Sequence, residues 1–286
     1  MGHHYVPQKY LQGFTQPTNP KALWQFDKGT QQFTETPVSI KRIAQQRQFY
    51  ADQTEILLNE LVEIPGNAVL TKLRNGDFDL TDTDRANLSV YIATMTHRVP
   101  NHRLKADEMA PGVLDNVTSR LRDQIRAFAD AGRISSDVAA RRLAETDEAH
   151  RKFSKTMPVE VQEDLYSPWP SERIIGLIFN MHWRFAVATG GQLFVTTDNP
   201  AFFFTCYGLG TQDSELTFPV SNELAIFGSW TPTRETNRII RKTQFVKEAN
   251  RRLISDATRF VYHRTNADWI ATVAAKDAPY LSRIRW

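Results

Sequence analysis

The sequence predicts an α+β fold in which β-rich N- and C-terminal parts form a sheet and a mainly helical segment lies between them. Three observations predict it: short runs rich in β-branched and aromatic residues near both ends, helical spacing of apolar residues in the middle, and no internal repeat. The chain has 286 residues, 41% apolar and 23% charged, as in ordinary globular proteins. We expect a single domain, 1–286, with an N-terminal arm and short strands in 1–50, mainly helices in 54–190, and a β-rich part with a last helix in 191–286.

The first part of the chain predicts extended structure followed by a helix. Residues 23–27 and 31–36 are typical of two short strands around a glycine turn. Apolar residues take up helical spacing near Thr54, and Pro65-Gly66 should kink or break that helix. A second helical piece should end at Asn75-Gly76.

Helices are also predicted for most of the middle segment. Thr81 and Asp84 form a capping-box pattern, and this helix should end at Val99-Pro100, because proline disfavours the α conformation in the residue before it. The other predictions here are a helical stretch over 101–131 interrupted near Pro111-Gly112, a helix over 135–155, a connector over 158–170, and a helix from Ser171 to about residue 188.

The last third of the chain changes in character. Short β-rich segments bounded by turn residues occupy 192–197, 201–205, 216–220 and 223–227. An amphipathic helix over 243–257 then leads into an extended segment at 260–262.

Composition limits the compartment and the partners. Cys206 is the only cysteine, so no internal disulfide can form, which fits a reducing compartment. No run approaches the ~20 apolar residues of a membrane helix, and the N-terminus lacks the features of a secretory signal. The net charge of +3 and the basic clusters at 41–47, 98–105 and 238–252 favour solvated helix faces over a polyanion-binding surface. We expect a cytoplasmic protein that does not bind membranes.

The opening segment, residues 3–14, contains the first candidate site residues. His3 and His4 are adjacent, and on an extended chain their side chains point to opposite sides, so that one can face a site while the other packs. A neutral imidazole can act as a general base near pH 7 or ligate a metal. Gln8 is a candidate binding residue in the same segment. The alternative is an N-terminal arm whose histidines are partly buried and hydrogen-bonded.

A second candidate segment ends a predicted strand at residues 194–200. It places Thr197, Asp198 and Asn199 at a strand tip, where loops commonly hold binding groups. We therefore consider Asp198 a candidate catalytic residue and its two neighbours candidate binding residues. The alternative is a structural turn, because Asp and Asn before proline hydrogen-bond to their own backbone.

Arg98 is the third candidate. It extends the apolar stripe formed by Tyr91 and Met95, so its guanidinium should be buried and paired. A structural ion pair and an anion-binding arginine both fit this position.

Together these segments resemble a bacterial family of domains of unknown function, numbered 4238. The likeness lies in the His-His-Tyr-Val-Pro-Gln opening at 3–8, the Arg-x-Pro helix end at 98–100, the Thr-Asp-Asn-Pro strand at 194–200, residues 218–221, and the last helix at 246–262. The chain departs from the family at Arg42, where an Asn often precedes the Ile. The resemblance implies membership of this family and no established activity.

The opening also resembles the first motif of His-Asn-His nucleases, in which one histidine is the base and its neighbour helps to bind metal. Such a module needs an Asn and a His on a following helix, whereas the next histidine after His4 is His97. A compact module is not expected, and a nuclease-like site assembled from distant segments stays an alternative.

Three functional hypotheses follow. The first is a hydrolase acting on a phosphodiester or nucleotide, with His3 or His4 as base, Asp198 as metal ligand or orienting group, and Arg98 holding phosphate. A divalent metal is the candidate cofactor, and a small molecule or nucleic acid the candidate substrate. The second is a ligand-binding or sensor module without turnover. The third is structural, with His4 and Asp198 satisfying each other in a buried polar network. We favour the first, because these motifs together exceed what a core usually needs. The oligomeric state is not predicted.

Overall fold

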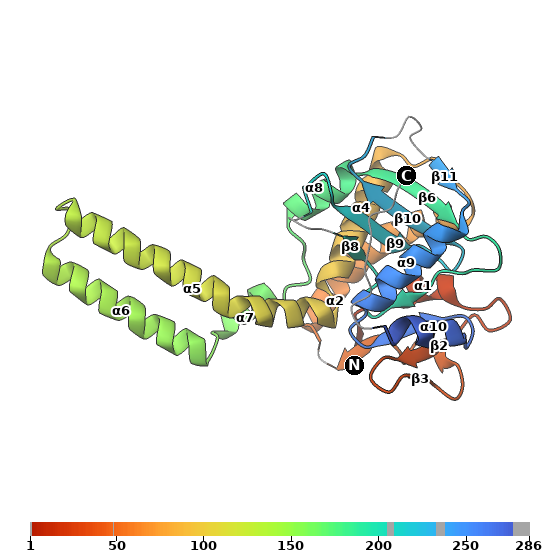
Figure 1. Cartoon of the computed structure of the whole chain (residues 1–286), viewed down its shortest axis with the longest axis horizontal. Coiled ribbons are helices and arrows are strands. Elements are labelled where there is room, and N and C mark those ends of the chain that lie inside the picture. Colours follow the sequence, from red (N-terminus) through yellow and green to blue (C-terminus); the bar gives the residue numbers. More distant parts are fainter. Residues whose placement is uncertain (1, 48, 205–208, 233–237, 277–286) are drawn as a thin grey trace. The chain divides into compact units, whose positions relative to one another are not determined.

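The structure is a computed structural model that describes residues 2–47, 49–204, 209–232 and 238–276 (Figure 1). Strands lie towards both ends of the chain and helices dominate the middle, which confirms the predicted α+β fold. The chain divides into two compact units. We call Met1–Asn101 with Pro168–Trp286 the main unit, and His102–Ser167 the helical unit. Within the described residues no helix is long and apolar enough to cross a membrane. Cys206 lies outside the described residues.

One sheet of the main unit joins the two ends of the chain. Its strand order is β3-β2-β12-β7, and β4 pairs with the far end of β2. The strands are β2 (Ala22–Asp27), β3 (Gln32–Phe33), β4 (Val38–Ser39), β7 (Thr196–Thr197) and β12 (Phe260–His263). All pairings are antiparallel, and the register places Phe26 beside Val261. The predicted contribution of both ends to a sheet is therefore confirmed.

A second sheet is formed by the C-terminal half alone. Its order is β11-β6-β10-β9-β8, antiparallel except for the parallel pair β11 and β6. The strands are β6 (His182–Val187), β8 (Phe202–Phe204), β9 (Glu215–Pro219), β10 (Leu224–Ser229) and β11 (Arg238–Ile240). Every residue of β9 and β10 is buried, as expected for central strands covered on both faces.

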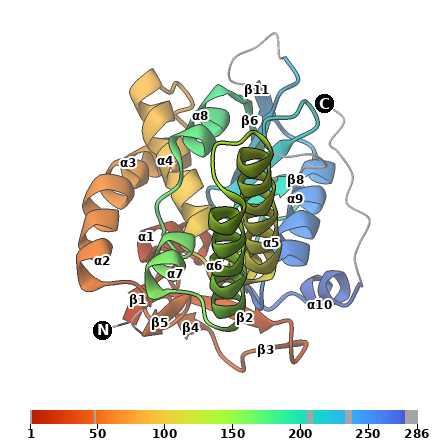
Figure 2. The same cartoon turned by 90° about the vertical axis from the view of Figure 1, so that its left-hand side faces the viewer.

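Helices of the main unit pack around these sheets (Figure 2). They are α1 (Gln8–Leu11), the 3₁₀ turn η1 (Gln12–Phe14), α2 (Asp52–Leu58), the π turn η2 (Asn59–Glu63), α3 (Ile64–Arg74), α4 (Asp82–His97), α8 (Glu172–Asn180), α9 (Thr243–Asp256) and α10 (Asp268–Ala274). α4 contacts both α3 and α8. Thr81 and Asp84 form the predicted capping box. Of the kink or break predicted at Pro65-Gly66, a break does not occur, because α2, η2 and α3 follow one another without interruption. The proline lies in the first turn of α3, directly after the π turn, where a helix tolerates a missing N–H.

The helical unit is an α-helical hairpin followed by a short helix. It contains nearly all of α5 (Pro100–Asp130), together with α6 (Ser136–Lys155) and α7 (Val159–Leu165). Gly132 adopts the left-handed conformation (φ 67°) at the turn after α5, and the Ser135 side chain caps α6, the helix predicted over 135–155. The predicted interruption near Pro111-Gly112 is wrong, because Pro111 lies inside a continuous helix. The predicted connector over 158–170 in fact contains α7.

Two predicted boundaries in the C-terminal half also differ. The helix that begins after Ser171 ends at Asn180, and residues expected to continue it form β6. An apolar run buried on both faces has no helix-specific period, so pairing with β10 decides its structure. The strand predicted over 192–197 shortens to β7. Its first part is held by the Asn250 side chain, which accepts from the N–H of Val195 at 2.9 Å and donates to the carbonyl of Leu193 at 2.7 Å.

Candidate functional site

The N-terminal arm separates the two histidines. β1 (Gly2–His4) pairs antiparallel with β5 (Gln45–Arg47), and His3 is buried, with 3% of its surface exposed. Its Nδ1 accepts from the backbone N–H of Tyr50 at 3.2 Å, and its Nε2 lies 3.0 Å from Asp52 Oδ1. Because Nδ1 accepts, Nε2 carries the proton and donates it to Asp52. Both nitrogens of His3 therefore already have partners, one at the end of the arm and one at the start of α2.

His4 lines a cavity of about 770 Å³. Its Nε2 is buried and has no hydrogen-bond partner among the described residues. Burial lowers the pKa of the imidazole below its ordinary value, against opposing effects of the Lys41 backbone and the Glu63 charge. The ring is therefore neutral at pH 7 and has a nitrogen available to a ligand or a proton.

Two segments of the main unit supply the described lining of this cavity, which we call the His4 cavity. The arm and the start of α1 and η1 contribute His4, Pro7, Gln8, Lys9 and Gln12; the continuous helix α2–η2–α3 contributes Glu55, Ile56, Asn59, Glu63, Ile64 and Asn67. The helix residues that carry polar groups recur every four positions. In an α-helix with about 3.6 residues per turn, a four-residue repeat slowly rotates around the helix axis. The π turn η2 holds more residues per turn, which reduces this rotation and keeps the four side chains on one face.

The helix side of the cavity carries two further unpartnered polar atoms. Glu55 Oε2 and Asn67 Oδ1 are buried without a hydrogen-bond partner among the described residues. Burial raises the pKa of Glu55, and the like charge of Glu63 adds to this rise, whereas Arg98 and the backbone N–H of His4 lower it. The cavity therefore holds three buried polar atoms without a protein partner in the described part of the chain: His4 Nε2, Glu55 Oε2 and Asn67 Oδ1. Such atoms need hydrogen bonds from water or from a ligand.

Arg98 does not line the cavity but binds two residues that do, Glu63 and His4. Its side chain is 1% exposed; Nη1 donates to Glu63 Oε1 at 2.7 Å, and Nη2 donates to the backbone carbonyl of His4. The Tyr50 hydroxyl donates to the Arg98 carbonyl at 2.5 Å. The prediction of a buried and paired guanidinium is confirmed. The guanidinium joins the arm to the helix and is occupied by Glu63.

Asp198 is placed elsewhere. Its carboxylate is 2% exposed and accepts three backbone N–H groups at the start of β12: Thr258 on Oδ1 at 2.9 Å, and Arg259 and Phe260 on Oδ2 at 2.7 and 2.9 Å. Burial raises its pKa to about 6, against these three hydrogen bonds, which lower it. Asp198 is not among the residues that line the His4 cavity.

The neighbours of Asp198 also hold the fold. Thr197 Oγ1 donates to the Asn199 carbonyl at 2.7 Å and accepts from the Asn199 N–H at 3.0 Å. Asn199 Nδ2 donates to Asp256 Oδ2 at 2.5 Å. The strand tip therefore ties β7 to the end of α9 and the start of β12. Of the predicted site residues, His4 and Gln8 meet in one cavity, and Arg98 contacts two of its walls through Glu63 and the His4 carbonyl.

Sequence reasoning did not identify Glu55, Glu63 or Asn67 as site residues. The signal for them was a four-residue repeat of polar side chains, Glu55, Asn59, Glu63 and Asn67, across a predicted helix break at Pro65. Treating Pro65 as a break hides this repeat. Within the described part of the chain there is no group of three or more His, Cys, Asp or Glu side chains that could hold a metal ion.

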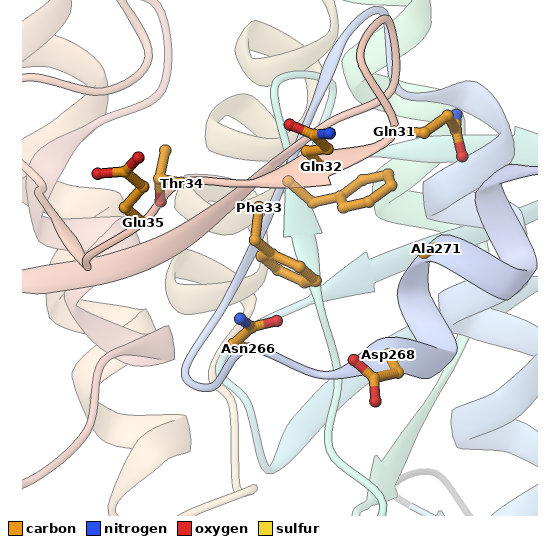
Figure 3. Close-up of a pocket in the computed structure, with 9 residues that line it drawn as sticks. Gln31, Gln32, Phe33, Thr34, Glu35, Asn266, Asp268 and Ala271 are labelled. Atoms are coloured by element: carbon orange, nitrogen blue, oxygen red, sulfur yellow. The ribbon is translucent and has the colours of Figure 1, made fainter.

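A second cavity of about 390 Å³ lies between the β2–β3 hairpin and α10. Figure 3 shows Phe33 projecting toward Asn266, with Gln31 and Glu35 at opposite ends. The described lining contains carboxylates and carboxamides but no histidine. The His4 cavity is therefore the better candidate for proton-transfer chemistry.

Fold and cavity together define an α+β protein with a helical hairpin inserted in its sequence and a polar cavity that contains a neutral histidine and a half-buried carboxyl group. The chain belongs to the family described as protein of unknown function (DUF4238), whose model matches residues 2–267. This match confirms the family suggested by the opening and by the Thr-Asp-Asn-Pro strand. No curated protein and no solved structure matches the chain.

Proposed function

We propose that the His4 cavity is the acid–base site of a hydrolase acting on a phosphodiester or nucleotide. One observation carries the proposal: His4 Nε2 and Glu55 Oε2 line the same cavity, are both unpartnered, and belong to groups whose pKa values burial shifts toward their neutral forms. A neutral histidine can accept a proton, and a carboxyl group with a raised pKa can donate one.

The roles follow from the directions of these two pKa shifts. His4 Nε2 takes a proton from water as the water oxygen attacks the substrate, and Glu55 delivers a proton to the leaving oxygen. Arg98 is a positioning residue, because it holds Glu63 and the His4 carbonyl in place. The lining Lys9 is the cation available to a phosphate group, since Arg98 is paired with Glu63.

The carboxamides of the cavity suit the remainder of a nucleotide. Gln8, Gln12 and Asn59 each present a donor and an acceptor, which match ribose hydroxyls and base edges. The same carboxamides, with the unpartnered Asn67 Oδ1, also support the second candidate function, binding of a small polar ligand without turnover.

Two variants of cavity residues and one control variant, at the histidine next to His4, test the proposal. His4→Gln keeps hydrogen-bonding capacity but cannot take up a proton at neutral pH, so hydrolysis on a panel of nucleotides and phosphodiesters should fall by about 10² or more. Glu55→Gln should show a loss of similar size. His3→Gln is the matched control, because His3 lies outside the cavity; it should lower the melting temperature while leaving kcat unchanged.

Other outcomes would contradict the hydrolase. If the wild-type protein turns over none of the panel but a nucleotide raises its melting temperature and His4→Gln abolishes that shift, the cavity is a binding site. If no compound is hydrolysed and none shifts the melting temperature, the unpartnered atoms are satisfied by water and the arm is structural.

We further propose that the protein is bacterial and cytoplasmic. The resemblance of its motifs to a bacterial family supports the first, and the single cysteine supports the second. Fractionation of cells that express the untagged chain would test its location.

A further inference from the structure

The helical unit leaves one apolar row of α5 uncovered. Met109, Val113, Val117 and Leu121 recur every four residues, and 45–66% of each side chain is exposed. The adjacent row lies one residue later. Its members are less exposed: Ala110 and Leu114 are half-buried, and Thr118 is buried. A helix with two neighbouring apolar rows is typical of a bundle, in which each helix contacts two others.

The helical unit has little core of its own. Thr118 and Ala139 are the buried side chains described for it, and none of its residues belongs to the described hydrophobic clusters. Two helices alone bury too little apolar surface to be well stabilised. Covering the exposed row would supply the missing burial.

We propose that two copies of this chain associate through α5, antiparallel about a two-fold axis between Val113 and Val117, so that the two hairpins form a four-helix bundle. A two-fold interface must be self-complementary. With this centre Met109 of one copy lies opposite Leu121 of the other, and Val113 lies opposite Val117. Each exposed apolar residue of the row therefore lies opposite an apolar residue of the same row in the other copy.

Charges beside the row favour the same arrangement. The row one residue earlier runs from Glu108 through Gly112 and Asn116 to Arg120. With the same two-fold axis Glu108 of each copy lies opposite residue 122 of the other, and Arg120 of the other copy is about two residues, roughly 3 Å along the helix axis, from that point, within reach of the Glu108 carboxylate. Both are exposed, and neither has an ion-pair partner among the described residues. A Cβ placed on Gly112 would meet nothing within 4 Å, so this flank is open to a second helix.

The charge balance argues for a second copy over other occupants. Residues 102–167 hold eleven Lys and Arg against twelve Asp and Glu, so two such units do not repel each other through net charge. A nucleic acid or an anionic membrane surface would require an excess of basic side chains beside the apolar row.

Sedimentation equilibrium of the full chain tests the interface. At about 50 µM the wild-type protein should sediment as a dimer of the 32.8-kDa chain. Val117→Glu places two carboxylates in the interface and should give a monomer with unchanged helix content. Ser119→Glu adds the same charge on the opposite face of α5 and should remain dimeric. A monomeric wild-type protein, or a dimeric Val117→Glu variant, would overturn the proposal.

A charge exchange tests the antiparallel register. Glu108→Arg and Arg120→Glu should each weaken dimerisation about fivefold or more, because each places like charges close to one another. The double variant should restore the wild-type dissociation constant. Failure of the double variant to recover would exclude this register.

Discussion

Asp198 shows how one buried side chain can organise several strands. Its two oxygens accept three consecutive backbone N–H groups, those of Thr258, Arg259 and Phe260, while its own N–H donates to the Phe260 carbonyl at 3.0 Å. Without the carboxylate, these three backbone donors in a partly buried turn would lose a charged acceptor, which is costly. The Asp198 carboxylate therefore has a structural role, as the acceptor for the backbone N–H groups of this turn.

Asp198→Asn should destabilise the protein by about 1–3 kcal/mol, because the new amide NH₂ faces backbone N–H groups and leaves at least one of them unpaired. Urea denaturation would measure the loss. Asp123→Asn, at a carboxylate that is 70% exposed, is the matched control and should change the free energy of unfolding by about 0.5 kcal/mol or less. Equal effects of the two variants would contradict a structural role for Asp198.

His4 should make stability depend on pH. Its folded pKa lies below the ordinary value of 6.5, so as pH falls through 6.5 the unfolded chain binds a proton before the folded chain does. The free energy of unfolding contributed by His4 is present above pH 6.5 and is lost as pH decreases toward the folded pKa. In His4→Gln this loss should disappear.

Denaturation of wild-type and His4→Gln protein at pH 7.5 and pH 5.5 would measure the effect. The raised pKa values of Glu55 and Asp198 act in the opposite direction, and those groups are present in both proteins. The difference between the two proteins therefore isolates His4. An identical pH dependence would mean that His4 titrates normally.

At the scale of elements, the contact between α3 and α4 depends on a glycine. A Cβ placed on Gly66 would lie 2.2 Å from the ring of Tyr91, far inside contact distance. Tyr91 is buried and contributes to the main core, so its ring has little freedom to move. The close approach brings α4, with Arg98 just beyond its end, against the helix that carries the cavity residues.

Gly66→Ala should destabilise the protein by about 1–3 kcal/mol, although alanine is the better helix former, because the methyl group overlaps Tyr91. Gly176→Ala in α8 is the matched control. Its Cβ would meet nothing within 4 Å, so this variant should be stabilised by up to about 1 kcal/mol. Thermal denaturation of both variants would compare them, and stabilisation at both positions would show that α3 and α4 are further apart.

At the scale of the whole molecule, the chain is built from a discontinuous main unit and an inserted helical unit. The described core clusters lie in the main unit, and both lining segments of the His4 cavity come from its N-terminal part. The main unit therefore needs no core residue of the helical unit.

Replacement of residues 103–166 by a flexible Gly/Ser linker of about ten residues should leave the main unit folded. We expect cooperative unfolding, near-ultraviolet circular dichroism of the buried aromatic rings, and retention of any ligand-induced stabilisation. The same variant should be monomeric, because it lacks α5. Loss of cooperative unfolding would show that the two units form one folding domain, as the sequence alone suggested.

Much of the architecture could be predicted from local patterns. The capping residues Thr81, Ser135 and Ser171 mark three helix starts, because each cap acts within one turn of its own chain. Arg98 could be expected to be buried and paired, because an arginine on an apolar helical stripe needs a partner. The opening and the Thr-Asp-Asn-Pro strand were sufficient to identify the family.

The sequence by itself determined the α+β class, most helix starts and the family. Only the tertiary structure decided that residues 182–187 pair as β6, that Asp198 holds a turn, and that His4 lines one cavity with Glu55 while His3 is hydrogen-bonded to Tyr50 and Asp52 outside it. The physical reason is range. Caps and periodicity act between residues a few positions apart, whereas strand pairing, burial and pKa shifts depend on groups that folding brings together from some fifty positions away, such as His4 and Glu55, or sixty, such as Asp198 and Thr258.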